Sequence, residues 1–343
     1  MSKKTFNSQE WLHLTEVAHA AVLSGLLAAK RWEPGEVKFQ GGTSLHLIYG
    51  SPRFSEDLDF ITASDRGLFN AMQGSLAYVR AALARQFPQI TVSLKSRDDG
   101  SEERPRNPRL YTLSLSEPDW YQTLKVKVEF YVADAQAVIR YGSQLRQVIA
   151  IPSDLRVDIA PTKVTTADLV EILSDKIHAL GDRARIKERD VFDLWWICNQ
   201  QGLNAGQAAA EFFKRIDYHL AMYPGGSNLP ELADNLLARG KELSAIAGDD
   251  ALLKDMVQAI ARWLPSNRGE PSVYCSKTVI RDMVNHSAAC AYETARLIHS
   301  GHVYGPHDRL EERLEEDRRK KQAEDDDDPD DELVEARGYD LPR

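Results

Sequence analysis

The stretch from Lys38 to Thr62, KFQGGTSLHLIYGSPRFSEDLDFIT, restricts the fold of this chain more than any other segment. Its pattern predicts a strand, a Gly-Gly turn, a short helix, a loop and a second strand. Asp57 and Asp59 stand two positions apart on the second strand, so their carboxylates point to the same face of a sheet. Two like charges in a partly buried place repel each other unless a cation lies between them, and oxygen ligands suit Mg²⁺. The sequence therefore predicts that these two aspartates are metal ligands.

The glycines ahead of the acidic pair predict a phosphate-binding turn. Gly41 and Gly42 let the backbone turn sharply and approach a ligand closely. Thr43 and Ser44 then begin a helix, whose free N–H groups favour phosphate. We expect Gly42, Thr43 and Ser44 to hold the β- and γ-phosphates of a nucleoside triphosphate through N–H groups and hydroxyls. A plain helix N-cap has the same local sequence, so the prediction depends on the acidic pair that follows. A phosphate cradle before a metal-binding carboxylate pair indicates nucleotidyl transfer.

A third carboxylate is expected from a neighbouring strand. Glu129 lies between apolar residues on the predicted strand Leu124–Tyr131. It is therefore a candidate third ligand for a divalent cation, Mg²⁺ or Mn²⁺. The alternative is an exposed strand residue paired with Lys125 or Lys127.

Two polar residues stand just before the acidic pair. Arg53 offers a fork of donors that could clamp a phosphate oxygen. It could equally brace Asp57 or Asp59, and the sequence leaves both roles open. Ser55 is expected to help bind the nucleotide.

A second charged cluster follows much later in the chain. Lys176 lies in the helical segment EILSDKIHAL, and a buried lysine needs an anion, either a triphosphate or Asp193. Asp193 stands among large apolar residues, which makes it a candidate general base, or the group that holds Lys176 or an acceptor hydroxyl. Arg189 and Asp190 are expected to help bind the nucleotide. Asp190 also stands near a helix start, where an acid is stabilised without any catalytic task.

These motifs together resemble a known family. GGTSLHLIYGSPRFSEDLDF is similar to the first motif of the AbiEii/AbiGii nucleotidyltransferase-like toxins of abortive-infection and toxin–antitoxin systems, within the polymerase-β-like nucleotidyltransferase superfamily. Glu171–Ala179 matches the family's helix with a lysine, and Arg189–Leu194 matches its R-D-x-x-D-L run. The matches span residues 38–195, over half the chain.

The resemblance implies an enzyme that blocks translation. It implies Mg²⁺-dependent transfer of NMP from an NTP to the 3′ acceptor end of tRNA, with Lys176 on the triphosphate. It also implies a cognate antitoxin encoded nearby. Two alternatives stay open: NMP transfer to, or phosphorylation of, a protein side chain, and a regulatory protein that binds nucleotide without turnover.

Composition and pattern divide the chain into three parts. We expect an α/β (α+β) nucleotidyltransferase domain with a mixed, twisted sheet at 1–160, an all-helical domain that completes the cleft at 161–304, and a largely disordered tail at 305–343. The tail holds 16 acidic and 8 basic residues, so it accounts for most of the net charge of −9. The rest of the chain is near neutral and can still carry a local basic surface for RNA.

The predicted helices before the boundary are Trp11–Val22 and Gly67–Phe87. Those after it cover 166–182, 190–201, 205–221, 229–245, 249–264 and 277–300. The other predicted strands are Val37–Phe39, Leu58–Ile61, Ile90–Leu94 and Leu110–Leu115.

Two basic runs could contact RNA or could be solvated loops. The first consists of Arg183, Arg185, Lys187 and Arg189, and the second of Arg97, Arg104, Arg106 and Arg109.

Location and cysteine chemistry follow from the rest of the sequence. The N-terminus lacks the apolar core of a signal peptide, and no apolar run is expected to span a bilayer, so the predicted location is the cytoplasm. Cys198, Cys275 and Cys290 are far apart and form neither a disulfide framework nor a zinc spacing. We expect them to be buried thiols.

Overall fold

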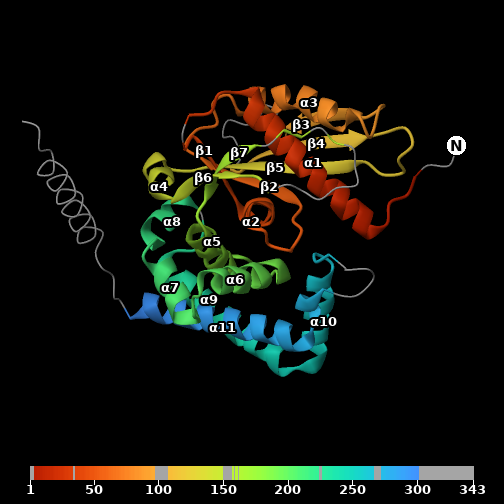
Figure 1. Ribbon diagram of the computed structural model, residues 1–343. Coiled ribbons are helices and arrows are strands. Elements are labelled where there is room, and N and C mark those ends of the chain that lie inside the picture. The colour runs from red at the N-terminus through yellow and green to blue at the C-terminus, as the bar shows by residue number, and fades with distance from the viewer. Residues whose placement is uncertain are drawn as a thin grey trace, which may run out of the picture. The chain divides into compact units, whose positions relative to one another are not determined.

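The computed structural model describes residues 4–33, 35–96, 107–149, 157, 159–160, 162–223, 226–265 and 272–300. The tail expected at 305–343 lies outside these residues, as do Arg97, Arg104 and Arg106. The chain up to Ser300 forms one compact unit. This unit consists of a sheet with helices on both of its faces (Figure 1). We call the sheet, together with the helices on its first face, the sheet portion. We call the group of helices on its second face the helical portion.

The sheet portion contains a mixed seven-stranded sheet, as the sequence predicts. The strand order is β3-β4-β5-β2-β1-β7-β6. β2 is antiparallel to β1 and parallel to β5, and β1 is parallel to β7. The strands are β1 (Val37–Gln40), β2 (Asp57–Thr62), β3 (Thr91–Ser96), β4 (Arg109–Ser116), β5 (Leu124–Val132), β6 (Ser143–Gln147) and β7 (Lys163–Ala167).

Two long helices cover the first face of the sheet, α1 (Ser8–Ala29) and α3 (Leu68–Ala84) (Figure 1). α1 begins with a capping box, in which the side chains and backbones of Asn7 and Glu10 satisfy each other. The apolar core on this face includes Leu58 and Phe60 of β2, both fully buried. Because neighbouring residues of a strand point to opposite faces, this burial turns the acidic residues of β2 to the second face.

Although no apolar run was expected to span a bilayer, α1 is long and apolar enough to do so by its length and composition alone. Of its most apolar window, 61% is buried inside the unit. Packing against α3 and the sheet therefore accounts for its apolar composition.

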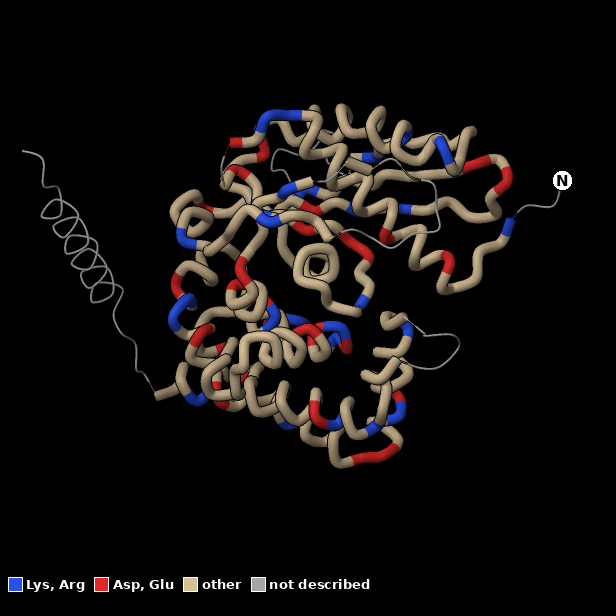
Figure 2. Tube along the Cα trace, in the orientation of Figure 1, with Lys and Arg blue, Asp and Glu red and all other residues tan. Residues whose placement is uncertain are grey.

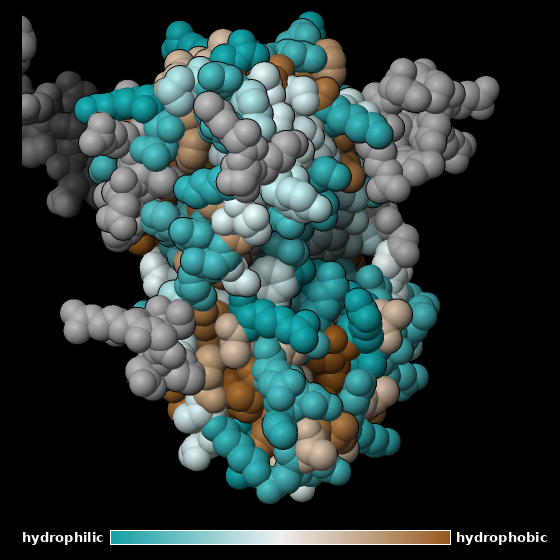
Figure 3. Space-filling model, turned by 90° about the vertical axis from the view of Figure 1, so that its right-hand side faces the viewer, coloured by the Kyte–Doolittle hydropathy of each residue, from teal (hydrophilic) through white to brown (hydrophobic). Residues whose placement is uncertain are grey.

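The helical portion lies against the second face of the sheet. Its helices are α5 (Leu169–Asp182), α6 (Glu188–Gln201), α7 (Ala205–Phe213), α8 (Ile216–Met222), α9 (Leu229–Gly248), α10 (Asp250–Ala261) and α11 (Lys277–His299). The shorter α2 (Gly41–Tyr49) and α4 (Ala135–Arg140) belong to the connections of the sheet. Figure 3 shows one side of the unit, where apolar side chains gather mainly over the helical portion.

The structure corrects the prediction at several elements. β6, β7 and α4 were not predicted, because they are short and their polar residues give no clear period. Thr166, predicted inside a helix, lies in β7, and α5 begins only at Leu169. The helix predicted at 205–221 is two helices, because the chain turns between Phe213 and Ile216.

The boundary predicted at residue 160 separates β7 from the sheet to which it belongs. We propose that the functional division instead follows β7, at Asp168.

Candidate active site

Three acidic side chains form one row on the second face of the sheet. β5 alternates like β2, with buried apolar residues on the first face and Lys127 and Glu129 on the other. The parallel register places Asp59 beside Glu129 and Asp57 beside Lys127. The predicted third carboxylate therefore lies next to the predicted pair, brought there by strand pairing.

Two pockets flank this row. Asp59 and Glu129 line a pocket of about 390 Å³, together with Lys176 of the helical portion. Asp57 lines a second pocket, of about 670 Å³. In Figure 2, acidic segments of β2 lie above a basic connection between α5 and α6.

The acidic row is electrostatically strained without a cation. The pKa of Asp59 is raised from 3.8 to about 7, first by burial and then by the charges of Glu129 and Asp57. Lys176 and Arg189 oppose this rise without cancelling it. Burial also raises the pKa of Glu129, and the charge of Asp57 adds to it.

The residues of the row fit a divalent metal ion. Oδ1 of Asp57 is buried and has no hydrogen-bond partner among the described residues. Its nearest cationic group is Nζ of Lys127, at 3.5 Å. An unpartnered carboxylate oxygen beside two raised-pKa carboxylates is the donor set that Mg²⁺ or Mn²⁺ prefers.

The glycine turn lies directly against the acidic row. α2 begins at Gly41, earlier than predicted, and Gly41 has φ +77°. A Cβ atom there would contact Oδ2 of Asp59. A Cβ atom at Gly42 would contact Nη2 of Arg53 and lie 2.8 Å from Oγ of Ser55. Because Gly41 and Gly42 have no side chain, the N-terminus of α2 can lie close to the acidic row.

The two hydroxyls at the start of α2 are used inside the fold. Thr43 donates its hydroxyl hydrogen to the backbone carbonyl of Asp57. The hydroxyl of Ser44 shares a hydrogen bond with that of Thr166, at 2.6 Å. Both residues are almost fully buried, so a phosphate contact through either hydroxyl would first have to break its internal hydrogen bond. The N–H groups of the helix N-terminus remain for an anion.

Arg53 has a different partner from those predicted. Its Nε and Nη2 donate to the two carboxylate oxygens of Asp193, at 2.6 and 2.7 Å, and Nη1 donates to the carbonyl of Phe54. The Arg53 side chain is 2% exposed. The donors of Arg53 are therefore used by Asp193 and Phe54 and not by Asp57 or Asp59, and the side chain fixes α6 to the loop before β2.

Asp193 also forms an ion pair with Lys176, which is one of the roles predicted for it. Nζ of Lys176 lies 2.8 Å from Asp193 and 2.9 Å from Asp190. Burial alone would raise the pKa of Asp193, but the charges of Arg53 and Lys176 outweigh it and lower this pKa. An ionised, fully buried carboxylate between two cations is poorly placed to accept a proton. The geometry favours the holding role over that of a general base.

Asp190 and Arg189 also have specific partners. Asp190 pairs with Arg183 as well as with Lys176, so its role exceeds that of a helix N-terminal acid. Arg189 donates to Glu56 at 3.1 Å, and its guanidinium lies 4.9 Å from the ring centre of Trp263.

Several residues of the first pocket were not predicted. They are Tyr131, Asp175, His178, Asp182, Arg183 and Tyr223. Asp175, His178 and Asp182 follow the i, i+3, i+7 spacing of one helix face, which was visible in the sequence. His178 lines the pocket, and burial lowers its pKa to about 4.

Replacing Gly42 with alanine is expected to lower the free energy of unfolding by about 1–3 kcal/mol, because the new methyl group forces apart closely packed atoms. Arg53 cannot yield freely, since Asp193 holds it on both oxygens. Urea denaturation measures the loss. The matched control is Gly248→Ala in α9, where a Cβ atom has no neighbour within 4 Å. Equal stability of the two variants would contradict the packing argument.

The pKa of Asp59 predicts a pH-dependent stability in the absence of divalent cations. Because this pKa is raised from 3.8 to about 7 in the folded protein, the folded state binds the proton more tightly. The resulting stabilisation is complete below about pH 4 and is lost as the pH rises to about 7. Asp59→Asn cannot ionise, so its melting temperature should exceed that of the wild type by a growing margin over this range. Melting curves in a chelator measure the difference, and a constant margin would refute the assignment.

Comparison with known proteins places these features in a family. The family profile "Nucleotidyl transferase AbiEii toxin, Type IV TA system" matches residues 30–268. A comparison with curated proteins gives no match.

The solved structures that are similar to this chain include two bacterial proteins. MenT4, a nucleotidyltransferase toxin from Mycobacterium tuberculosis, is 16% identical with a TM-score of 0.55, over 86% of this chain and 93% of its own. JHP933 from Helicobacter pylori is 18% identical with a TM-score of 0.43, over 92% of this chain and 98% of its own. The similarity to MenT4 supports the nucleotidyltransferase fold. The family match, which covers more than half of the chain, shows that this protein belongs to the AbiEii family of nucleotidyltransferase toxins of type IV toxin–antitoxin systems.

Proposed function

We propose that this protein transfers NMP from an NTP to a macromolecular hydroxyl, and that the 3′ acceptor end of tRNA is the substrate. The observation that carries the proposal is the pocket in which Asp59 and Glu129 of the sheet face Lys176 of the helical portion. A volume of about 390 Å³ lies within the range of small-molecule sites.

Each group around the pocket has a task in this proposal. Asp57, Asp59 and Glu129 would hold Mg²⁺ or Mn²⁺, which would neutralise phosphate charge and orient the reacting oxygens. Lys176 would bind the triphosphate, and the N-terminus of α2 would donate N–H groups to it. Asp193 and Asp190 position the ammonium group of Lys176.

The second pocket suits an acceptor nucleic acid. Its lining includes Trp11 and Trp263 with Lys125 and Lys127. Aromatic rings stack on unpaired bases, and lysines attract the phosphate backbone. Asp57 borders this pocket and Asp59 borders the first, so the acidic row would stand between the NTP and the acceptor.

Membership of a type IV toxin–antitoxin family implies an antitoxin partner. We propose that the antitoxin is encoded nearby and that both proteins act in the cytoplasm. In this proposal, modification of the tRNA acceptor end blocks aminoacylation and stops translation.

The decisive experiment uses full-length protein, Mg²⁺, total tRNA and each of the four NTPs labelled at the α-phosphate. We expect label in tRNA with one preferred NTP, and none after periodate oxidation of the tRNA 3′ end. An assay with γ-labelled NTP runs beside it. Label from the γ-phosphate, or label that enters protein and not tRNA, would contradict the proposal and would favour a protein acceptor.

A further inference from the structure

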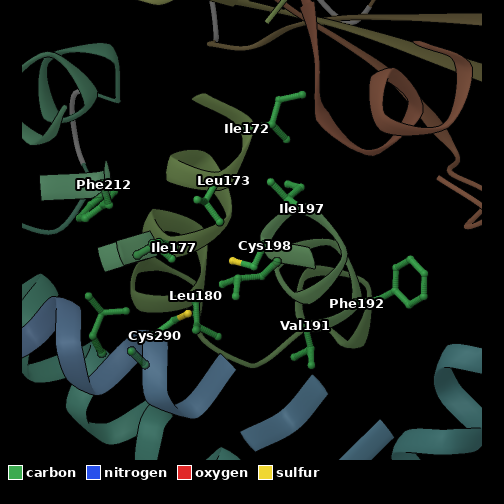
Figure 4. Close-up of a cluster of buried hydrophobic side chains, with 14 of the residues drawn as sticks. Ile172, Leu173, Ile177, Leu180, Val191, Phe192, Ile197, Cys198, Phe212 and Cys290 are labelled. Carbon is green, nitrogen blue, oxygen red and sulfur yellow. The ribbon is translucent and has the colours of Figure 1, made fainter. Parts of the chain in front are cut away.

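A cluster of metal-ligating side chains lies in the helical portion, apart from both pockets. It consists of Cys198 on α6 and of His286 and Cys290 on α11, and one donor atom from each lies within 4.8 Å of the others. His286 and Cys290 are four residues apart, so they share one face of α11. Cys198 is 1% exposed and Cys290 is fully buried. Figure 4 shows both thiols among apolar side chains.

One polar atom of this cluster lacks a hydrogen-bond partner. Nε2 of His286 is buried and has no hydrogen-bond partner in the part of the chain that the structure describes. A buried ring nitrogen without a partner costs free energy, so its retention needs a reason.

We propose that Cys198, His286 and Cys290 form a Zn²⁺ site that ties α6 to α11. Two thiolates and one imidazole are ligands that zinc prefers, and a water molecule would complete a tetrahedral set from the partly exposed side of His286.

The net charge of the complex favours Zn²⁺ over Cu⁺, the other cation that such ligands bind. Two thiolates cancel the charge of Zn²⁺, so the complex is neutral and can lie in an apolar core. Cu⁺ with the same ligands would leave one buried negative charge without a partner, which is costly. The site is independent of nucleotide chemistry, because none of its residues lines either pocket.

The sequence gives no zinc signal here, because the ligands come from helices far apart in the chain. Zinc motifs are recognised by pairs of closely spaced cysteines and histidines. Here α6 supplies a single ligand, and α11 supplies a His-x-x-x-Cys pair whose cysteine has no local partner. The three proposed ligands come together only because α6 and α11 pack against each other.

Cobalt titration of metal-free full-length protein tests the site. We expect one Co²⁺ per chain with thiolate-to-metal charge-transfer absorption of two thiolates, displaced by one Zn²⁺. His286→Gln should weaken binding at least about tenfold, as loss of a direct ligand or of its support does. Cys198→Ser and Cys290→Ser should each remove half of the charge-transfer intensity or more. Cys275→Ser is the matched control, because Cys275 lies outside the cluster.

Two results would overturn the proposal. One is the absence of charge-transfer absorption in the wild type and in Cys275→Ser at equimolar Co²⁺, which does not depend on whether the site variants fold. The other is an absorption that survives Cys198→Ser and Cys290→Ser. A supporting measurement is the melting temperature, which zinc at a hundredfold excess over its Kd should raise by about 5 °C in the wild type and not in His286→Gln. An intact mass showing a Cys198–Cys290 disulfide in freshly isolated protein would also count against the metal.

Discussion

Asp59→Asn is expected to abolish NMP transfer while the protein stays folded. The amide keeps the shape of the side chain and removes the charge that would hold the cation. Such sites supply several kcal/mol of transition-state stabilisation, so the rate should fall at least about 1,000-fold. The measurement is the transfer of α-labelled NMP, with circular dichroism as the check on folding. Asp59→Ala should fail in the same way, because it also removes the ligand.

A matched acidic residue makes this test specific. Asp255 is an exposed aspartate on α10, outside both pockets, so Asp255→Asn should transfer NMP at the wild-type rate. Glu129→Gln should also lose activity, since the register places it beside Asp59. Normal transfer by folded Asp59→Asn protein would remove the metal assignment. Loss in the Asp255 variant as well would show that general charge effects, and not the acidic row, control the reaction.

Asp193→Ala is expected to lower the free energy of unfolding by about 3–5 kcal/mol, the range for breaking a buried ion pair from one side. Asp193 is fully buried, and its loss leaves Arg53 without its charged partner and Lys176 with Asp190 alone. Urea denaturation measures the loss. Nucleotide transfer should fall too, because Lys176 loses one of the two groups that position it.

A double variant separates the buried charge from the shape of the site. Arg53→Met with Asp193→Leu removes both charges and keeps apolar volume, so it should recover much of the stability while remaining poorly active. The surface pair of Arg140 and Asp217 provides the comparison, since both side chains are more than a third exposed. Asp217→Ala should cost less than about 1 kcal/mol. Similar losses for Asp193→Ala and Asp217→Ala would contradict the buried-pair argument.

The sequence predicted most of the acidic row because its logic is local. Period-2 alternation on β2 was enough to place Asp57 and Asp59 on one face. Glu129 required one further assumption, that its strand is a neighbour of β2, and the parallel register confirms that assumption. The family and the mixed sheet were predicted correctly for the same reason, since the motifs lie on elements with clear patterns.

The parts that the sequence did not give depend on contacts between distant segments. Arg53 and Asp193 are 140 residues apart, so no spacing rule pairs them. The hydroxyls of Thr43 and Ser44 look available in the sequence, and only the packing of α2 on the sheet shows their internal partners. β6 and β7 are short, with SQLRQ and KVTTA as their residues, and neither alternates clearly enough to be predicted.

The Arg53–Asp193 pair has a consequence for the order in which the protein is made. A ribosome releases the glycine turn and the whole acidic row long before α6 leaves the exit tunnel. Until then, the guanidinium that packs against Gly42 has no counter-ion, and Lys176 has none of its positioning acids. A partly synthesised chain therefore carries the acidic row without the two groups that fix Lys176. Under the proposed function, transfer activity would begin only after α6 has been made and has folded against the sheet portion.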